Sequence, residues 1–155
     1  MSTPATVALT RLGLPFTTHS YDHDPAVESF GLEAAQATGM PAERIFKTLL
    51  VDTGAGLAVG IVPVSGSLDL KAMAAALKVK KVAMADPAAA QRSSGYVVGG
   101  ISPIGQRRAL PTVIDSSALT FETVFVSGGR RGFEIEIAPA DLATATRGLF
   151  AAIGR

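Results

Sequence analysis

Glycine, proline and capping residues divide this sequence into short segments, in which strand-like and helix-like patterns follow one another without strict alternation. Apolar runs predict strands at residues 16–21, 45–51, 57–62, 80–84, 112–115, 123–127 and 133–137. Capping residues and helical spacing predict helices at residues 4–12, 31–38, 68–77 and 139–153, and a helical turn from Asp86. A doubly wound sheet needs strict alternation, so we predict an α+β (mixed α/β) domain: a curved mixed sheet with helices packed outside.

Three of these helices have a recognisable start. Thr3 followed by Pro4 is typical of a first turn, and Gly13 is typical of the residue that ends a helix. Ser67 is expected to cap the helix at residues 68–77. Pro139 is expected to open a last helix that continues to residue 153.

The chain has 155 residues, of which 48% are hydrophobic, which suffices for one packed core and is too short for two full-sized domains. We therefore expect residues 1–155 to form a single domain. Cysteine is absent, which excludes disulfides, thiolate nucleophiles and cysteine-based metal centres. The N-terminus does not resemble a signal peptide, and no run approaches the ~18 apolar residues of a membrane span. These features predict a cytoplasmic protein with no membrane association.

The net charge of +1 is distributed unevenly along the chain. Residues 1–70 hold three basic and seven acidic side chains, whereas residues 71–155 hold eleven basic and six acidic ones. The excess is largest from Lys71 to Arg108, where Asp86 is the only acidic residue. This segment is a candidate surface for phosphates. The alternative is that its cations only solubilise a helix and loops rich in alanine and glycine.

Lys47 interrupts an apolar run, residues 45–51, that otherwise predicts a buried strand. An unpaired buried ammonium group is costly, so Lys47 must reach an anion or solvent. One interpretation is a functional cation. The other is an edge-strand lysine that discourages aggregation or extends to the surface.

Two glycine-rich segments can direct backbone N–H groups at an anion: GGISPIG at residues 99–105 and SGGRRG at residues 127–132. Neither matches GxGxxG or a P-loop, so no nucleotide cofactor is predicted. Each segment alone is more often a turn than a site. Two of them in one small domain favour a shared pocket.

The two histidines, His19 and His23, lie four residues apart beside two aspartates. A metal site would need a third ligand that this spacing does not supply, so no metal is predicted. The sequence has no GxSxG elbow, and nothing in it supports a Ser-His-Asp triad. Tyr21 and Tyr96 can each bind a ligand through the hydroxyl or cover a core with the ring.

Five runs of the sequence resemble, in order, the YbaK family of freestanding aminoacyl-tRNA deacylases, which are related to the editing domain inserted in bacterial prolyl-tRNA synthetases. The runs are YDHDP (21–25), FKTLLV (46–51), MADP (84–87), GYVVGGISPIGQ (95–106) and VSGG (126–129). The resemblance extends from about Phe16 to the last helix. GGISPIGQ with a downstream SGG is its specific part. Within the family, the sequence is most similar to the Cys-tRNA(Pro) deacylases.

The resemblance implies a single mixed α/β domain with an open-barrel-like sheet and a pocket for the aminoacyl-adenosine end of tRNA, without metal or cofactor. It implies catalytic roles for Lys47, Gly99 and Ser127. Glu134 stands where Cys-tRNA deacylases commonly have Asp, so its longer side chain leaves open how the amino group or ribose is recognised. The implied substrate-binding residues are Tyr21, Phe30, Thr48, Gly100, Ile101, Gly128 and Glu134.

The implied substrate is misacylated tRNA(Pro), above all Cys-tRNA(Pro), and a potential partner is prolyl-tRNA synthetase. The cations expected to contact acceptor-stem phosphates are Lys80, Lys81, Arg107 and Arg108. An ester is already activated, so its cleavage needs orientation and charge stabilisation more than a strong nucleophile. The resemblance also suggests that the substrate's own cysteine thiol attacks the ester and leaves as a thiolactone.

Two alternatives remain open at this point. One is a deacylase of the same fold whose pocket prefers alanine or another small amino acid. The other is a non-catalytic tRNA-binding module or synthetase adaptor. The sequence also leaves open whether the chain or a partner synthetase recognises the tRNA, and it does not indicate the oligomeric state.

Overall fold

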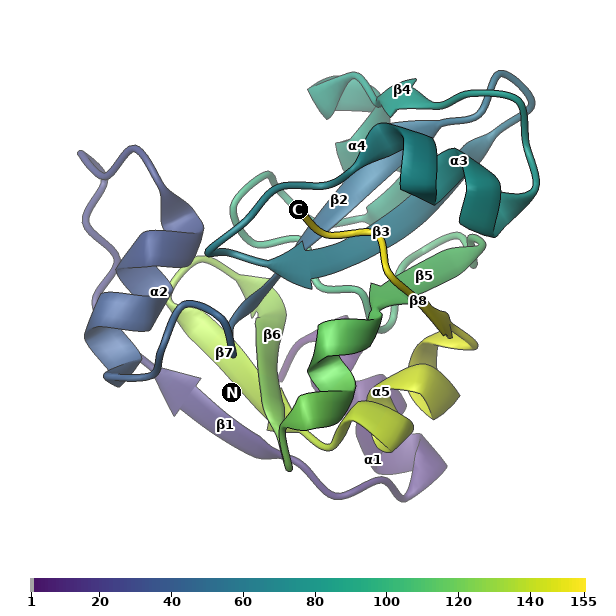
Figure 1. The fold of residues 1–155 in the computed structure, drawn as a ribbon. Helices are drawn as coiled ribbons and strands as arrows, with labels where there is room; N and C mark the ends of the chain where they lie inside the picture. The colour runs from purple at the N-terminus through teal and green to yellow at the C-terminus, as the bar shows by residue number, and fades with distance from the viewer. Residues whose placement is uncertain (1) are drawn as a thin grey trace.

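The computed structural model describes residues 2–155 and shows two β-sheets with helices around them (Figure 1). The first sheet is antiparallel, in the order β1 (Thr17–Ser20), β7 (Phe133–Ile137), β6 (Val124–Arg130). The second is mixed, in the order β4 (Ala83–Met84), β2 (Phe46–Asp52), β3 (Leu57–Pro63), β5 (Thr112–Asp115), β8 (Leu149–Ala151). In it β2 is antiparallel to β3 and β4, whereas β5 is parallel to β3 and β8.

The two sheets meet at the start of β2. Ile45, directly before β2, forms a parallel bridge with Phe125 of β6, and the Phe125 N–H donates to the Arg44 carbonyl at 3.1 Å. The predicted curved mixed sheet is therefore present as two parts joined at this bridge, and it is not closed into a barrel. This bridge places β2 beside β6, which carries the SGG segment, and β7 with Glu134 pairs with β6 on its other side.

Local sequence signals account for several of the helix ends. The Thr3 hydroxyl accepts the Thr6 N–H as the N-cap, and Gly13 ends that helix in the left-handed conformation with φ 68°. Asp86 caps the helix that starts at Pro87. These predicted starts and stops are confirmed. The helices are α1 (Pro4–Leu12), α2 (Phe30–Thr38), α3 (Leu70–Leu77), α4 (Pro87–Ser94), α5 (Pro139–Thr146) and the short 3-10 helix η1 (Ser116–Thr120).

The largest hydrophobic core lies between the sheets and combines both ends of the chain with its middle. Leu9 of α1, Phe46 of β2, Ile135 of β7 and Leu142 of α5 belong to it, and all are at most 2% exposed. A second cluster, around Met73, packs α3 against the other face of the second sheet. Within residues 2–155, no helix has both the length and the apolar character that a membrane crossing requires.

The predicted start of α3 is wrong, because Asp69 and not Ser67 caps it. The Asp69 carboxylate accepts the Ala72 N–H at 3.1 Å. Ser67 is instead paired with Arg155, since each donates its N–H to the other's carbonyl at 2.9 Å. This contact joins residues 88 apart along the chain, so the local pattern around Ser67 could not reveal it.

The last predicted helix is also too long. It ends at Thr146, where Arg147 takes the left-handed conformation with φ 54°, and Leu149–Ala151 forms β8 beside β5. The predicted strand at residues 80–84 is reduced to Ala83–Met84, since only these residues find a partner on β2. Pairing with a distant strand overrides local preference in these segments.

Candidate active site

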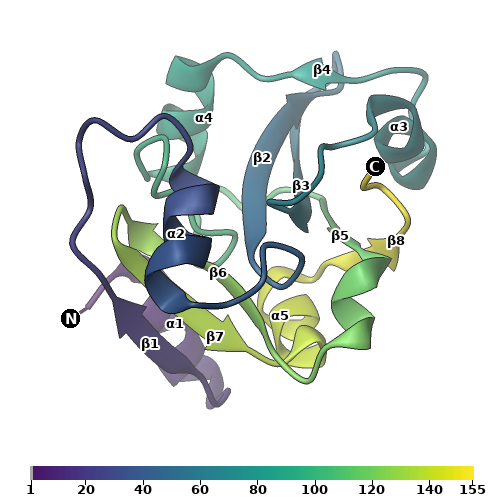
Figure 2. The same ribbon diagram turned by 60° about the vertical axis from the view of Figure 1, so that its left-hand side comes forward.

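One cavity of about 320 Å³ lies where α2, β2 and α4 meet the facing residues of β6 and β7. Figure 2 shows α2 and α4 next to β2. The cavity brings together residues that are widely separated in the sequence, from Tyr21 to Glu134. Eight of the ten residues predicted for catalysis or substrate binding line it: Tyr21, Phe30, Lys47, Thr48, Gly99, Ile101, Ser127 and Glu134.

β2 presents an open backbone edge to this cavity. One side of β2 pairs with β3 along its whole length, whereas on the other side only the bridge at Ile45 and the last two residues have a strand neighbour. Peptide directions alternate along a strand, and the Leu50 carbonyl accepts the Ala85 N–H on this second side at 3.0 Å. Thr48, two residues earlier, therefore directs its N–H and C=O to the open side, where a substrate can bind them.

The side chain of Thr48 adds a third polar group. Its Oγ1 is buried and has no hydrogen-bond partner within residues 2–155. A buried hydroxyl without a partner costs about 1–3 kcal/mol. A polar group of a bound ligand would remove this cost, which is a physical reason for the cavity to favour an occupant that can hydrogen-bond.

Lys47 is half-buried, and its Nζ donates to the carbonyl of Gly66 at 2.8 Å. An ammonium group has three donors, so two remain for a ligand. The Gly66 carbonyl holds the charge at the cavity wall, with no carboxylate within ion-pair distance among the described residues. In this environment Lys47 is available to bind an anionic or polarised group of a ligand.

Gly99 lies in a tight turn at the cavity wall. The Gly100 N–H donates to the Val97 carbonyl at 2.8 Å, and Gly99 has φ +87°, as the third position of a type II turn requires. A Cβ at Gly99 would lie 2.9 Å from the Phe30 ring and 2.9 Å from Nε of Arg131. Both the backbone conformation and the available space therefore require glycine at this position.

Ser127 and Glu134 face one another across β6 and β7, next to a bulge in the pairing. The Ser127 hydroxyl accepts the Gly129 N–H at 3.2 Å. Glu134 is only 7% exposed, and this burial raises its pKa to about 8. Burial likewise raises the pKa of Tyr21 to about 12. At pH 7 both side chains keep their protons and can donate hydrogen bonds to a substrate.

The raised pKa of Glu134 predicts a pH-dependent stability. The unfolded chain releases this proton near pH 4.5, whereas the folded chain holds it to about pH 8, so the group lowers the free energy of unfolding progressively as the pH rises across that window. We expect the free energy of unfolding of Glu134→Gln, measured with urea, to fall less between pH 5 and pH 8 than that of the wild type. Glu28 is exposed, so Glu28→Gln should leave the dependence of the free energy of unfolding on pH as it is in the wild type. An unchanged slope in Glu134→Gln would contradict the neutral carboxyl.

The Phe30 ring at the start of α2 is held by two side chains. The His23 ring lies 5.7 Å from it, centroid to centroid, and His23 Nδ1 is 2.7 Å from Glu33 Oε1. The Arg131 guanidinium carbon lies 4.9 Å from the ring centroid. Sequence reasoning missed Arg131 as an individual residue, although the combination of glycines with cations at residues 127–132 was a usable signal.

Gly100 and Gly128, also predicted to bind substrate, are not among the residues that line the cavity. A Cβ at Gly100 would lie 2.7 Å from the Cα of Arg130, and one at Gly128 would overlap the Phe133 ring. Their observed contribution is close packing of the turn at residues 97–100 on β6. Apart from Ser29, the rest of the cavity wall is apolar and includes Phe46, Leu50, Val64 and Ala90. Sequence reasoning did not single these out, because apolar residues in strands and helices are typical of any core.

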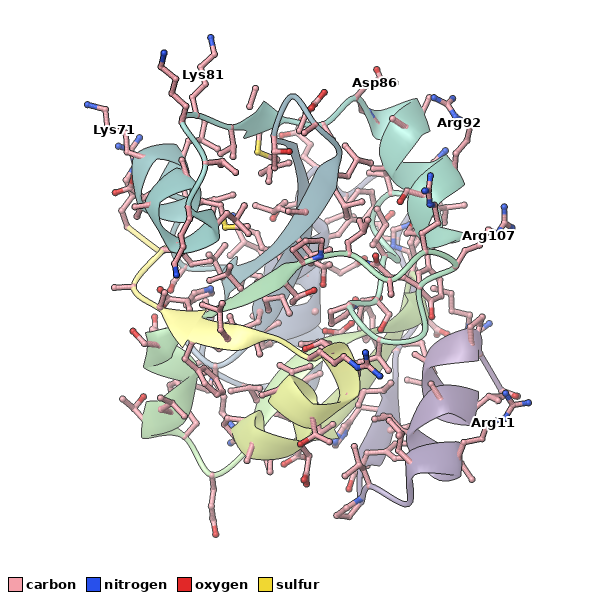
Figure 3. The ribbon with its side chains drawn as sticks, turned by 90° about the vertical axis from the view of Figure 1, so that its right-hand side faces the viewer. Arg11, Lys71, Lys81, Asp86, Arg92 and Arg107 are labelled. Carbon is pink, nitrogen blue, oxygen red and sulfur yellow. The ribbon has the colours of Figure 1, made fainter. Side chains whose placement is uncertain are left out.

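The four cations predicted to contact tRNA are exposed but lie in two places. Lys80 and Lys81 follow α3, and with Lys71 they line a shallow groove there. The backbones of Arg107 and Arg108 are hydrogen-bonded to Ser94 and Ser93, at the end of α4. Figure 3 shows Lys71 and Lys81 over α3, well apart from Arg92 and Arg107 beside α4. The basic segment of the sequence thus forms two surfaces.

The two histidines have separate carboxylate partners. His19 Nε2 lies 2.9 Å from Glu136 Oε1, and His23 contacts Glu33 as described above. Neither histidine is hydrogen-bonded to Ser127. Among residues 2–155, no three His, Asp or Glu side chains are grouped so that they could hold a metal ion.

The cavity combines an available ammonium group, an open strand edge, neutral hydrogen-bond donors and an apolar wall. Such a site can hold a small side chain, orient an activated ester and stabilise the negative charge that develops on its oxygen. It holds no serine activated by a histidine among the described residues.

The chain belongs to the family of aminoacyl-tRNA editing domains, because the model of that family, "Aminoacyl-tRNA editing domain", matches residues 24–145. The protein is an aminoacyl-tRNA deacylase, a hydrolase whose substrate is aminoacylated tRNA, and the YbaK-type resemblance is confirmed. A relative from Enterococcus faecalis (strain ATCC 700802 / V583) is named "Putative Cys-tRNA(Pro)/Cys-tRNA(Cys) deacylase EbsC". It is 39% identical over 120 residues, which cover 77% of this chain and 73% of that protein.

Solved structures confirm the fold. One, titled "Crystal structure of hypothetical protein APE2540", has a TM-score of 0.88 at 24% identity and covers 99% of this chain and 100% of its own. Another, titled "Crystal structure of a putative trans-editing enzyme for prolyl tRNA synthetase", has a TM-score of 0.84 at 24% identity and covers 100% and 99%. At this identity the likeness establishes the fold alone.

Proposed function

We propose that this deacylase removes cysteine from misacylated Cys-tRNA(Pro). The observation that carries the proposal is the cavity of about 320 Å³, in which an apolar wall suited to a small side chain lies beside Lys47, Thr48 and Gly99. The name of the Enterococcus faecalis relative supports cysteine as the amino acid. The matched family model supports an aminoacylated tRNA as the molecule that carries it.

The residues of the cavity divide the work of ester cleavage. Lys47 and the backbone of Gly99 stabilise the developing oxyanion, and Ser127 hydrogen-bonds the reacting group. The open edge of β2 at Thr48 and the neutral carboxyl of Glu134 orient the aminoacyl group or ribose. Tyr21, Phe30 and Ile101 enclose the terminal nucleoside.

The test is a release assay with tRNA(Pro) charged separately with cysteine, alanine and proline. We expect fast release of cysteine, and little release of alanine or of proline. Fast release of alanine would instead identify a deacylase for another small amino acid. No release from any of the three, with tRNA binding intact, would contradict the proposal and point to a different aminoacyl group or tRNA as the substrate.

We propose that the whole chain acts as one editing domain in the cytoplasm, where aminoacyl-tRNA is used. Residues outside the range 24–145, which the family model matches, support a single unit. Ala5 and Leu9 of α1 belong to the core between the sheets, and Ile153 belongs to the cluster that packs α3 against the second sheet. We also propose prolyl-tRNA synthetase as a partner that supplies tRNA identity. Addition of the synthetase should then sharpen the preference for Cys-tRNA(Pro) over Cys-tRNA(Cys).

We expect the exposed cations to contribute to tRNA affinity through phosphates. Each phosphate contact should add about −0.7 to −0.9 to the slope of log affinity against log salt concentration. We expect each of two double variants to reduce this slope by the amount that about two phosphate contacts contribute. One combines Lys80→Ala with Lys81→Ala, and the other combines Arg107→Ala with Arg108→Ala. Arg11→Ala, which removes an exposed cation on α1, serves as the control. Wild-type slopes for both double variants would show that these cations only solubilise the protein.

A further inference from the structure

Arg131 makes contacts at the cavity that the roles proposed above do not use. Its Nε and Nη2 both donate to the carbonyl of Val98, at 2.9 and 2.7 Å. Its guanidinium lies over the Phe30 ring, at 4.9 Å from the centroid. No carboxylate lies within ion-pair distance of Arg131 among residues 2–155. Two hydrogen bonds and the contact with the Phe30 ring hold this exposed side chain in one conformation, whereas most surface arginines sample several rotamers.

The carbonyl that Arg131 holds belongs to the same peptide unit as the Gly99 N–H. A trans peptide is planar, with its C=O and N–H pointing in opposite directions. Arg131 binds the Val98 carbonyl, so the Gly99 N–H of the same peptide points away from Arg131. Gly99 itself lines the cavity, and its N–H finds no acceptor among the described residues.

The other peptide orientation is available to this turn. A type I turn and a type II turn differ mainly by a flip of the central peptide, here the one between Val98 and Gly99. Gly99 at φ +87° is compatible with the observed form, and glycine also tolerates the flipped one. Without a strong donor outside the turn, little would hold the N–H toward the cavity.

We propose that Arg131 is a positioning residue that fixes the peptide between Val98 and Gly99, so that the Gly99 N–H is aimed into the cavity as an oxyanion donor. Its positive charge also polarises this peptide, which makes the N–H a better donor. The proposal rests on the deacylase activity and does not depend on which amino acid is removed.

The structure supplies a matched control next to Arg131 in the sequence. Arg130 is exposed as well, but its guanidinium lies over the Phe133 ring, at 5.6 Å from the centroid, and it does not line the cavity. Arg130→Ala removes the same charge from the same turn without touching the Val98 carbonyl. Arg131→Lys keeps a cation that can make one of the two hydrogen bonds.

The experiment measures kcat and KM for wild type and the three variants on aminoacyl-tRNA and on the same amino acid esterified to adenosine, which has no phosphate. For Arg131→Ala we expect a loss of about 10-fold in kcat on both substrates with little change in KM, because one oxyanion donor is loosened but not removed. Arg131→Lys should recover part of kcat, and Arg130→Ala should match wild type. The Gly99 amide signal in NMR should shift in Arg131→Ala and not in Arg130→Ala.

Three results would overturn the proposal. A loss confined to the tRNA substrate and to KM would make Arg131 a phosphate contact. An equal loss of kcat in Arg130→Ala would show that the effect comes from removing a positive charge and not from the contact with the Val98 carbonyl. An unshifted Gly99 amide in Arg131→Ala would show that the peptide does not need the arginine. Failure of the proposed cysteine specificity would appear in wild type itself, so the two are distinguishable.

Discussion

Lys47→Ala is expected to lower kcat/KM for deacylation by about 10²-fold, which corresponds to about 3 kcal/mol of transition-state stabilisation. The physical reason is that the ammonium, held at the cavity wall by the Gly66 carbonyl, keeps two donors for the oxygen that becomes negative. Lys47→Arg should not fully restore the rate, because a planar guanidinium cannot take the place of a compact ammonium. The measurement is single-turnover release from charged tRNA(Pro).

The fold should survive this substitution. Lys47 contributes one hydrogen bond to a carbonyl and no ion pair among the described residues, so the melting temperature of Lys47→Ala should stay near that of wild type. Arg11→Ala, on the surface of α1, controls for loss of a positive charge and should retain full activity. Turnover of Lys47→Ala at the wild-type rate would remove Lys47 from the active site and restore the edge-lysine interpretation.

tRNA(Pro) charged with serine is expected to be bound but cleaved at least about 10²-fold more slowly than tRNA(Pro) charged with cysteine, since a thiol ionises far more readily than a hydroxyl. The reason is the proposed mechanism, in which the substrate's thiol attacks its own ester carbonyl. In that step a C–S bond forms, the C–O bond to the ribose breaks, and the thiol proton passes to the departing ribose oxygen. The amino acid leaves as a cyclic thiolactone that water then opens.

The cavity suits this route because it offers orientation and charge stabilisation in place of an activated nucleophile. The Ser127 hydroxyl accepts the Gly129 N–H, and neither His19 nor His23 is hydrogen-bonded to it. We therefore expect Ser127→Ala to weaken catalysis, with no covalent acyl-enzyme trapped or lost, because the proposed route forms none on Ser127. Equal cleavage of serine and cysteine esters, or a burst from an acylated Ser127, would exclude the substrate-assisted route. Pocket shape alone separates such similar side chains by only about 1–3 kcal/mol.

The elements that the sequence predicted well are those whose signals are local. The first helix depends on Thr3, Pro4 and Gly13, and its bounds agree with the structure because caps act within one turn. The strand at Phe133–Ile137 alternates between two faces and was also found at its observed bounds. The elements that were misplaced, around Ser67 and after Thr146, are those whose backbone partners lie far away in the chain.

The candidate site followed the same division. Lys47 and Gly99 were visible in the sequence because a lysine in an apolar strand and a pair of glycines in a loop each need a special explanation. The family resemblance added Tyr21, Phe30 and Thr48, which the cavity contains. The role of Arg131 was not visible, because it depends on one guanidinium reaching a carbonyl 33 residues away.

By itself, the sequence determined the class of fold, the identity of eight of the residues that line the cavity and the family, since these follow from local patterns and ordered motifs. The tertiary structure alone decided that β2 keeps an open edge, that Glu134 is buried enough to stay neutral, and that the basic residues form two surfaces. The physical reason is that burial, pKa and free backbone groups depend on which distant segments pack together. No residue's own neighbours in the chain specify that packing.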